Sequence, residues 1–191
     1  MKILVLGQGG REHAIAWKLS LSSRVIKVYV CPGNGGTARE ENVENLDISI
    51  NDISSLISFV KKEDIDLTIV GPEVPLVEGI VDKFNKENLK IFGPSKNYAI
   101  LEGSKVFSKE FMKHYDIPTA DYEMFSSSQE AKDYIATKKH PIVIKADGLA
   151  AGKGVIISSN VEESYRAIDS LLNSQHSSHI VIEEFLTGQE L

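Results

Sequence analysis

Short apolar runs alternate with amphipathic segments over the first hundred residues, and this alternation restricts the possible folds more than any other feature. The helical pattern is clearest at Val77, Ile80, Val81 and Phe84, which recur at every third or fourth position. Asp52 is predicted to cap another helix. Strands separated by helices form parallel sheets with helices on both faces, so we predict an α/β fold with an open parallel sheet. The predicted strands are residues 3–6, 25–30, 67–70 and 90–92.

After Gly93 the pattern changes. Two helical stretches follow each other at about 95–101 and 104–115, and Pro118 disfavours helix in the residue before it. Two later strands directly flank a glycine-rich loop, so we expect them to pair as an antiparallel hairpin within a second, α+β unit. We expect a linker near 116–121. The remaining predicted elements are strands at 122–125, 141–146, 154–158 and 179–184, with helices at 128–138 and around 161–172.

Bulk properties exclude several classes of protein. A net charge of −6 disfavours nucleic acid as a partner, since proteins that bind nucleic acids normally carry a basic face. No segment reaches the apolar length of a membrane span. The single cysteine, Cys31, cannot form an internal disulfide, which fits a reducing compartment. We therefore predict a cytoplasmic protein with neither a nucleic acid nor a membrane as partner. The histidines and Cys31 show no zinc-site spacing.

Residues 142–154, IVIKADGLAAGKG, give the most specific chemical signal. Glycines at 148, 152 and 154 leave backbone N–H groups open to a ligand, and Lys153 adds positive charge. Lys145 lies inside the apolar run, where a half-buried ammonium group requires a negative partner. These features favour the phosphates of a nucleoside triphosphate. A flexible hairpin with a solvated lysine is the alternative.

Two further segments extend this hypothesis. Lys105 opens a helix, where a cation gains nothing from the helix dipole, and this misfit is a reason to suspect an anionic ligand. A lysine at such a position is usually solvated, and this is the alternative. Glu183 and Glu184 are neighbours in a strand, so only one of them points into a given cleft. Phe185 and Leu186 could sandwich an adenine, or they could pack in the core.

A glycine-rich turn, GQGGRE, joins the first strand to the first helix. It departs from the dinucleotide fingerprint, because Glu12 stands where a small residue is required and Cys31 where an acid should hold a ribose. A single phosphate fits better, with Arg11 available to pair with it. A tight turn without a ligand is the alternative.

Loops at 31–37 and 71–73 follow two other strands of the same sheet. The carboxyl ends of parallel strands line a ligand crevice, so the three loops favour a small polar substrate. Glu73 could accept a hydrogen bond from a ribose hydroxyl or an amine, or it could only favour the start of a helix.

Six stretches, in this order, resemble the phosphoribosylamine–glycine ligase family of the ATP-grasp superfamily. The resemblance implies a preATP-grasp domain at 1–102 and the start of an ATP-grasp domain at 103–191, with a nucleotide-binding subdomain at about 120–186. It also implies that the chain is part of a longer protein. The stretches are LGQGGREHAIAWKL, PGNGGTA, GPEVPLVEGIVD, IFGPSKNYAILEGSKVFSKEFM, PIVIKADGLAAGKGV and VIEEFLTGQEL.

The resemblance implies an activity as well. ATP would phosphorylate glycine, and the amine of 5-phosphoribosylamine would attack the glycyl phosphate to give glycinamide ribonucleotide, in de novo purine biosynthesis. The implied cofactors are ATP and Mg²⁺ or Mn²⁺. The ligands of the metal and of glycine are expected beyond residue 191, so we expect this chain alone to be inactive.

Site residues follow from the same resemblance. Gln189 departs from the acidic residue usual at its position, while Glu190 is retained. The implied ATP-binding residues are Lys105, Lys145, Gly148, Gly152, Lys153, Gly154, Glu183, Glu184, Phe185, Leu186 and Glu190. The implied phosphoribosylamine-binding residues are Gly9, Gly10, Arg11, Pro32, Gly33, Asn34, Pro72 and Glu73.

Three alternatives remain open. The first is another ATP-grasp carboxylate–amine ligase with a different acceptor. The second is a nicotinamide-dependent oxidoreductase, which Glu12 and Cys31 disfavour. The third is a non-catalytic nucleotide-binding module. The sequence gives no indication of the oligomeric state.

Overall fold

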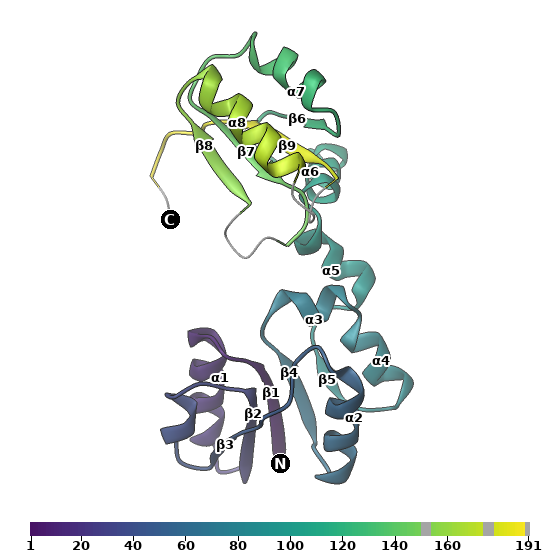
Figure 1. Ribbon diagram of the computed structural model, residues 1–191. Coiled ribbons are helices and arrows are strands. Elements are labelled where there is room, and N and C mark those ends of the chain that lie inside the picture. The colour runs from purple at the N-terminus through teal and green to yellow at the C-terminus, as the bar shows by residue number, and fades with distance from the viewer. Residues whose placement is uncertain (150–153, 174–177, 190–191) are drawn as a thin grey trace. The chain divides into compact units, whose positions relative to one another are not determined.

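The computed structural model describes residues 1–149, 154–173 and 178–189 (Figure 1). The chain divides into two compact units, Met1–Ala99 and Ile100–Leu191. Within the described ranges, no helix is long and apolar enough to cross a membrane.

The first unit contains a five-stranded parallel sheet in the order β3-β2-β1-β4-β5. From β1 the chain adds β2 and then β3 toward one edge of the sheet, and afterwards adds β4 and β5 on the opposite side of β1, toward the other edge. The order therefore reverses between β1 and β4, where open sheets of this kind bind ligands. The strands are β1 (Lys2–Gly7), β2 (Lys27–Pro32), β3 (Val43–Asn45), β4 (Leu67–Val70) and β5 (Ile91–Phe92). The helices are α1 (Gly10–Ser20), η1 (Thr37–Arg39), α2 (Ile53–Lys62), α3 (Glu73–Val77) and α4 (Ile80–Lys86).

Both faces of this sheet are covered, as the sequence predicts. Ile3 and Val5 of β1 pack with α1 on one face. Leu4 and Leu6 pack with α2 and α4 on the other, around the fully buried Phe84. Because side chains of a strand alternate between faces, one apolar run serves two cores.

Two details differ from the sequence prediction. The stripe that begins at Val77 belongs to two helices, because Gly79 takes the left-handed conformation (φ +83°) between α3 and α4. The short strand β3 was not predicted, since three residues, two of them polar, give no periodic signal. The predicted cap is confirmed, as the carboxylate of Asp52 accepts a hydrogen bond from the Ser55 N–H at 3.1 Å.

The second unit contains a four-stranded antiparallel sheet in the order β6-β9-β7-β8. The hairpin predicted around the glycine-rich loop is confirmed as β7 and β8. Helix α5 (Lys96–Gly103) lies across the boundary between the units. The other elements are α6 (Lys105–His114), β6 (Tyr122–Phe125), α7 (Ser128–Ile135), β7 (Ile142–Ala146), β8 (Val155–Ser158), α8 (Val161–Leu172) and β9 (Ile180–Glu184).

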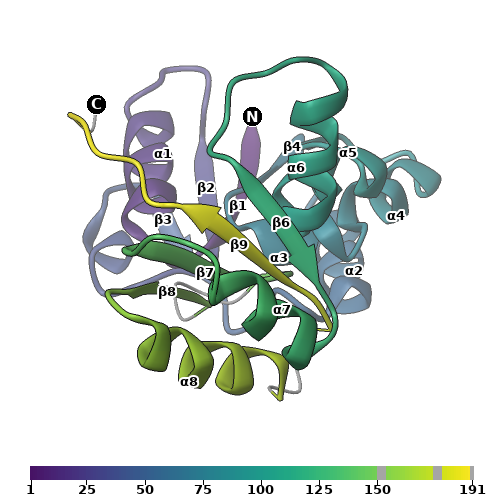
Figure 2. The ribbon, with the colours of Figure 1, turned by 90° about the horizontal axis from the view of Figure 1, so that it is seen from above.

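The two faces of this second sheet differ. Figure 2 shows α7 and α8 on one side of it, where Ile142 and Ile144 of β7 pack with both helices in an apolar core. The alternate residues of β7, Val143 and Lys145, are half-buried on the other face. Helix α6 packs against β9.

Candidate functional site

An ion pair lies on the face of the second sheet opposite to α7 and α8. The register pairs Lys145 with Val181 and Val143 with Glu183, so Lys145 and Glu183 are diagonal neighbours on one face. The ammonium group of Lys145 donates to the Glu183 carboxylate at 2.8 Å. Glu183 is therefore the negative partner that Lys145 requires. It is 6% exposed, whereas its neighbour Glu184 is exposed, as expected of alternating side chains.

Lys105 lies at the start of α6, beside the glycine-rich loop. Its ammonium group donates to the Gly148 carbonyl at 2.8 Å. The carboxylate of Asp147 accepts from the backbone N–H groups of Lys105 at 2.7 Å and Val106 at 3.2 Å, and Ser104 caps the helix as well. An internal anion thus already satisfies this helix N-terminus. The chain itself thus supplies an anion at the start of α6, and the assignment of Lys105 to the phosphates of a ligand stays a prediction.

Both lysines line a cavity of about 280 Å³. A third cation, Lys109, also lines it and was missed in the sequence. The available signal was its position one helical turn after Lys105, because residues four apart share a face of a helix. The other residues that line this cavity are Leu101, Glu102, Ser108, Met112, Val155 and Glu183.

The segment after Glu183 borders a second cavity, of about 350 Å³. Glu184 and Phe185 line it, together with Tyr134, His140 and Ile142. Phe185 is 38% exposed and Leu186 64%, so the alternative that these two side chains pack in the core is wrong. They are accessible to a ligand.

Predicted ATP-binding residues in the glycine-rich loop are only partly described. Gly148 takes the left-handed conformation (φ +88°), which other residues rarely adopt. The carbonyl of Gly154 accepts from the Ala146 N–H at 2.7 Å, where the hairpin resumes. Gly152, Lys153 and Glu190 lie outside the described residues.

In the first unit, three loops meet at the carboxyl ends of β1, β2 and β4. The guanidinium of Arg11 pairs with the Glu73 carboxylate at 3.1 Å. The side-chain amide of Asn34 donates to the Gln8 carbonyl at 2.9 Å, and the Gly33 N–H to the Gly7 carbonyl at 3.1 Å. Predicted phosphoribosylamine-binding residues from separate loops are thereby brought together. Pro32 ends β2, and Pro72 lies at the N-terminus of α3, next to Glu73.

Two hydrogen bonds lower the pKa of the Glu73 carboxyl. The backbone N–H of Glu73 and the guanidinium of Arg11 both donate hydrogen bonds to the Glu73 carboxylate. These bonds hold the pKa of Glu73 below its ordinary value. A negative group beside Arg11 gives this edge of the sheet both signs of charge.

Glu12 explains why the first turn does not form a dinucleotide site. Its side chain is 5% exposed and accepts from the Gly9 N–H at 2.7 Å. A Cβ atom at Gly7, Gly9 or Gly71 would lie 2.4, 2.8 or 2.3 Å from Glu12. The glycines therefore make room for this carboxylate, and the Gly9 N–H already has an acceptor. At Gly10 a Cβ atom would meet nothing within 4 Å.

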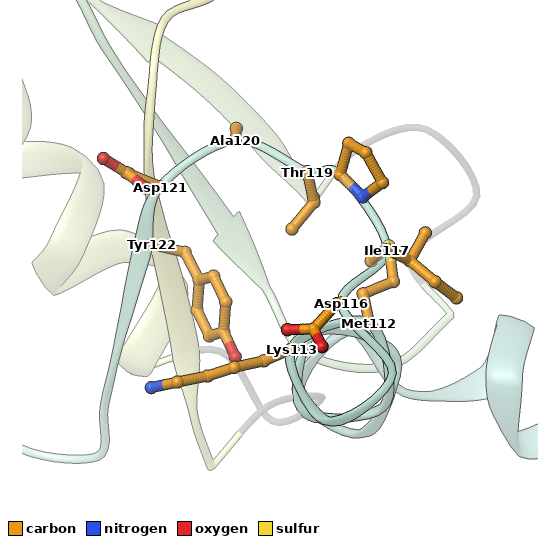
Figure 3. Close-up of a pocket in the computed structure, with 9 residues that line it drawn as sticks. Met112, Lys113, Asp116, Ile117, Thr119, Ala120, Asp121 and Tyr122 are labelled. Carbon is orange, nitrogen blue, oxygen red and sulfur yellow. The ribbon is translucent and has the colours of Figure 1, made fainter.

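A third cavity, of about 380 Å³, lies where α6 ends and the chain runs into β6 (Figure 3). Lys113, Asp116, Thr119, Asp121 and Tyr122 are among its lining residues. It has one cation against two carboxylates and none of the predicted nucleotide ligands, so it is a poor site for a triphosphate.

Over residues 1–149, 154–173 and 178–189, no three His, Cys, Asp or Glu side chains gather in a way that could hold a metal ion.

Comparison with known proteins shows which protein family the chain belongs to. The model "Phosphoribosylglycinamide synthetase, N domain" matches residues 1–102, and "Phosphoribosylglycinamide synthetase, ATP-grasp (A) domain" matches 103–191. The chain is 52% identical to the phosphoribosylamine–glycine ligase of Haemophilus influenzae and 53% identical to that of Escherichia coli K12. All of this chain is covered, but only 45% of each relative, so it spans less than half of their length.

Solved structures agree with this result. The phosphoribosylamine–glycine ligase of Thermotoga maritima superposes with a TM-score of 0.75 at 34% identity, over 99% of this chain and 45% of that one. The biotin carboxylase domain of the Hydrogenobacter thermophilus 2-oxoglutarate carboxylase, solved with MgADP, gives a TM-score of 0.72 at 18% identity. That match covers 97% of this chain and 44% of the other, and it shows a shared fold only.

Proposed function

The chain belongs to the phosphoribosylglycinamide synthetase family, and from this premise we propose that the whole protein ligates glycine to 5-phosphoribosylamine at the expense of ATP. A glycine carboxylate oxygen attacks the γ-phosphorus of ATP, and ADP leaves. The amine nitrogen of phosphoribosylamine then attacks the carbonyl carbon of the glycyl phosphate. Phosphate leaves, the nitrogen loses a proton, and glycinamide ribonucleotide remains.

One observation carries the nucleotide part of the proposal. Lys105 and Lys145 line one cavity, and the ammonium group of Lys105 donates to the carbonyl of Gly148, the first glycine of the glycine-rich loop. Two cations beside a glycine-rich segment are suited to the phosphates of ATP. The exposed Phe185 and Leu186 offer apolar surface for the adenine. Gly148, Gly152, Lys153, Gly154, Glu183, Glu184 and Glu190 complete the proposed ATP site.

Phosphoribosylamine is assigned to the first unit. Arg11 supplies a guanidinium that suits a phosphate, and Glu73 supplies a carboxylate that suits a ribose hydroxyl or an amine. Their present pairing with each other means that a ligand would replace an existing ion pair. The other proposed contacts are Gly9, Gly10, Pro32, Gly33, Asn34 and Pro72.

A divalent metal ion, Mg²⁺ or Mn²⁺, is part of the proposal for the whole protein. Such an ion would neutralise charge on the phosphoryl group in transfer. The described residues provide no set of side chains that fits such an ion. For the same reason we expect the 191-residue chain alone to form no product. A cytoplasmic location is proposed because the thiol of Cys31 is free and buried.

The test is a substrate-dependence assay with the whole protein. We expect ADP release from ATP to require both glycine and phosphoribosylamine, and glycinamide ribonucleotide to form in equal amount. Release that requires a different acid or amine would instead indicate another ATP-grasp carboxylate–amine ligase. Product formed by the 191-residue chain alone would contradict the expected need for further residues.

A further inference from the structure

Lys109 is a buried lysine that the proposed function does not use. It is 6% exposed, which is rare for a lysine unless its charge is paired. Its ammonium group donates to the Thr119 hydroxyl at 2.7 Å and to the Ala120 carbonyl at 3.3 Å. It also lies 5.2 Å from the centre of the Tyr122 ring. These contacts hold the ammonium group in one place.

The third polar contact of Lys109 is with Glu183. Its ammonium group lies 3.3 Å from the same carboxylate oxygen, Oε2, that accepts from Lys145 at 2.8 Å. The side chains of Lys109 and Glu183 are 7% and 6% exposed, whereas that of Lys145 is 27% exposed. Two cations thus share one buried oxygen, and only Lys145 is substantially accessible.

Because Lys109 and Lys145 share the Glu183 oxygen, the free-energy cost is lower when Lys145 leaves Glu183 to bind another anion. A buried carboxylate that loses its sole cationic partner is strongly destabilised. With Lys109 fixed beside it, Glu183 keeps a charged partner when Lys145 leaves. The exchange of one anion for another at Lys145 therefore costs less than it would without Lys109.

We propose that Lys109 is a positioning residue for nucleotide binding, which holds Glu183 paired so that Lys145 can bind the phosphates of ATP. This inference rests on the proposed function, because it takes Lys145 as a phosphate ligand. Lys109 acts through Glu183 and touches no phosphate itself.

The experiment is a double-mutant cycle in the whole protein, with affinities for a non-hydrolysable ATP analogue and for adenosine measured by calorimetry or competition. We expect Lys109→Met to weaken binding of the analogue about tenfold and to change it less than about twofold when Glu183 is already replaced by Gln. Adenosine affinity should stay unchanged, because adenosine carries no phosphate for Lys145. The matched control is Lys113→Met on the exposed side of α6, which should have no effect.

Several results would overturn the inference. Equal losses in the wild-type and Glu183→Gln backgrounds would mean that Lys109 acts directly by its charge. Parallel losses for the analogue and adenosine would mean that it only maintains the fold. If Lys109→Met does not fold, Lys109→Gln retains donors for Thr119 and Ala120 and faces the same criteria. Unchanged affinity in Lys145→Met would refute the proposed nucleotide site itself, whereas loss in Lys145→Met but not in Lys109→Met would refute only this inference.

Discussion

The two units place polar chemistry on their sheets in different ways. In the first unit both faces of the parallel sheet are packed, so Arg11, Asn34 and Glu73 lie beyond the strand ends, in the loop after β2 and in the first turns of α1 and α3. In the second unit the helices α7 and α8 cover one face, and Lys145 and Glu183 belong to the strands themselves. A sheet packed on both faces leaves only its edge for ligands. The second sheet has α6 packed against β9 on its other face, where Lys145 is still partly exposed, so this face can carry charged groups along its strands.

This difference has a consequence for substitutions. Arg11, Asn34 and Glu73 belong to neither apolar core of the first unit, so each can be replaced without removing a core side chain. In the second unit the strand residues that face the cavity alternate with those that build the core, so stability and binding are harder to separate. The following predictions test that contrast.

The largest effects are expected in the two cores. Phe84→Ala in the first unit should lower the free energy of unfolding by about 3–5 kcal/mol, and Ile144→Ala in the second by about 2–5 kcal/mol, because both side chains are fully buried. Urea unfolding measures both. Burial raises the pKa of the Cys31 thiol to about 11, so its alkylation at neutral pH should be slow in the native protein and faster in Phe84→Ala. A loss below about 1 kcal/mol at either site would contradict the assignment of that core.

The next largest effects are expected on ligand affinities, because each of the two units is proposed to bind a different ligand. Lys145→Met should weaken ATP binding by about 10- to 100-fold, the cost of a lost hydrogen bond between charged groups, and leave phosphoribosylamine binding unchanged. Arg11→Met should weaken phosphoribosylamine binding and leave ATP binding unchanged. The measurement is a pair of titrations of the whole protein with each ligand. If one variant weakens both ligands to the same extent, the assignment of separate sites is wrong.

A smaller effect is expected from the glycines around Glu12. Gly71→Ala should cost about 1–3 kcal/mol of stability, since its Cβ atom would lie 2.3 Å from the Glu12 carboxylate. The same change should cost less than about 0.5 kcal/mol when Glu12 is already Ala, because the clash is then gone. Gly10→Ala is the control, with a change of about 1 kcal/mol at most. Thermal unfolding compares the wild type with Gly71→Ala, Glu12→Ala, the double variant and Gly10→Ala.

The smallest effect concerns acid stability of the second unit. Hydrogen bonds from Lys132 and then Ser128 hold the pKa of Asp169 below its ordinary value of 3.8. Its contribution to stability is therefore present above pH 3.8 and is lost as the pH falls through the lower value in the folded protein. Asp169→Asn should unfold with a weaker pH dependence in this acidic window. Identical profiles for variant and wild type would show that the carboxylate contributes nothing.

Much of the fold could be predicted from periodicity. The parallel sheet, the β7–β8 hairpin and the need of Lys145 for a negative partner all follow from local patterns. That Glu183 is this partner depends on the register of β7 with β9. The break at Gly79 could not be predicted, because a glycine inside an apolar stripe does not reveal its φ angle. The role of Asp147 was also hidden, since a carboxylate that caps α6 from a distant loop leaves no signal near that helix.

The site was predictable where chemistry is local and not where it depends on tertiary contacts. Lys109 reads as an ordinary surface lysine until Thr119, Ala120 and Glu183 are placed around it. Glu12 was recognised as a departure from a known motif, but its contacts with Gly7 and Gly71 required the structure.

The alternation along β7 has an evolutionary consequence. Ile142, Ile144 and Ala146 face the core, while Lys145 faces the cavity. Loss or gain of one residue within this strand would turn the lysine into the apolar interior and the isoleucines toward the ligand, since side chains change face with every step. Related sequences should therefore tolerate length changes in the turn before β7 far more readily than inside it.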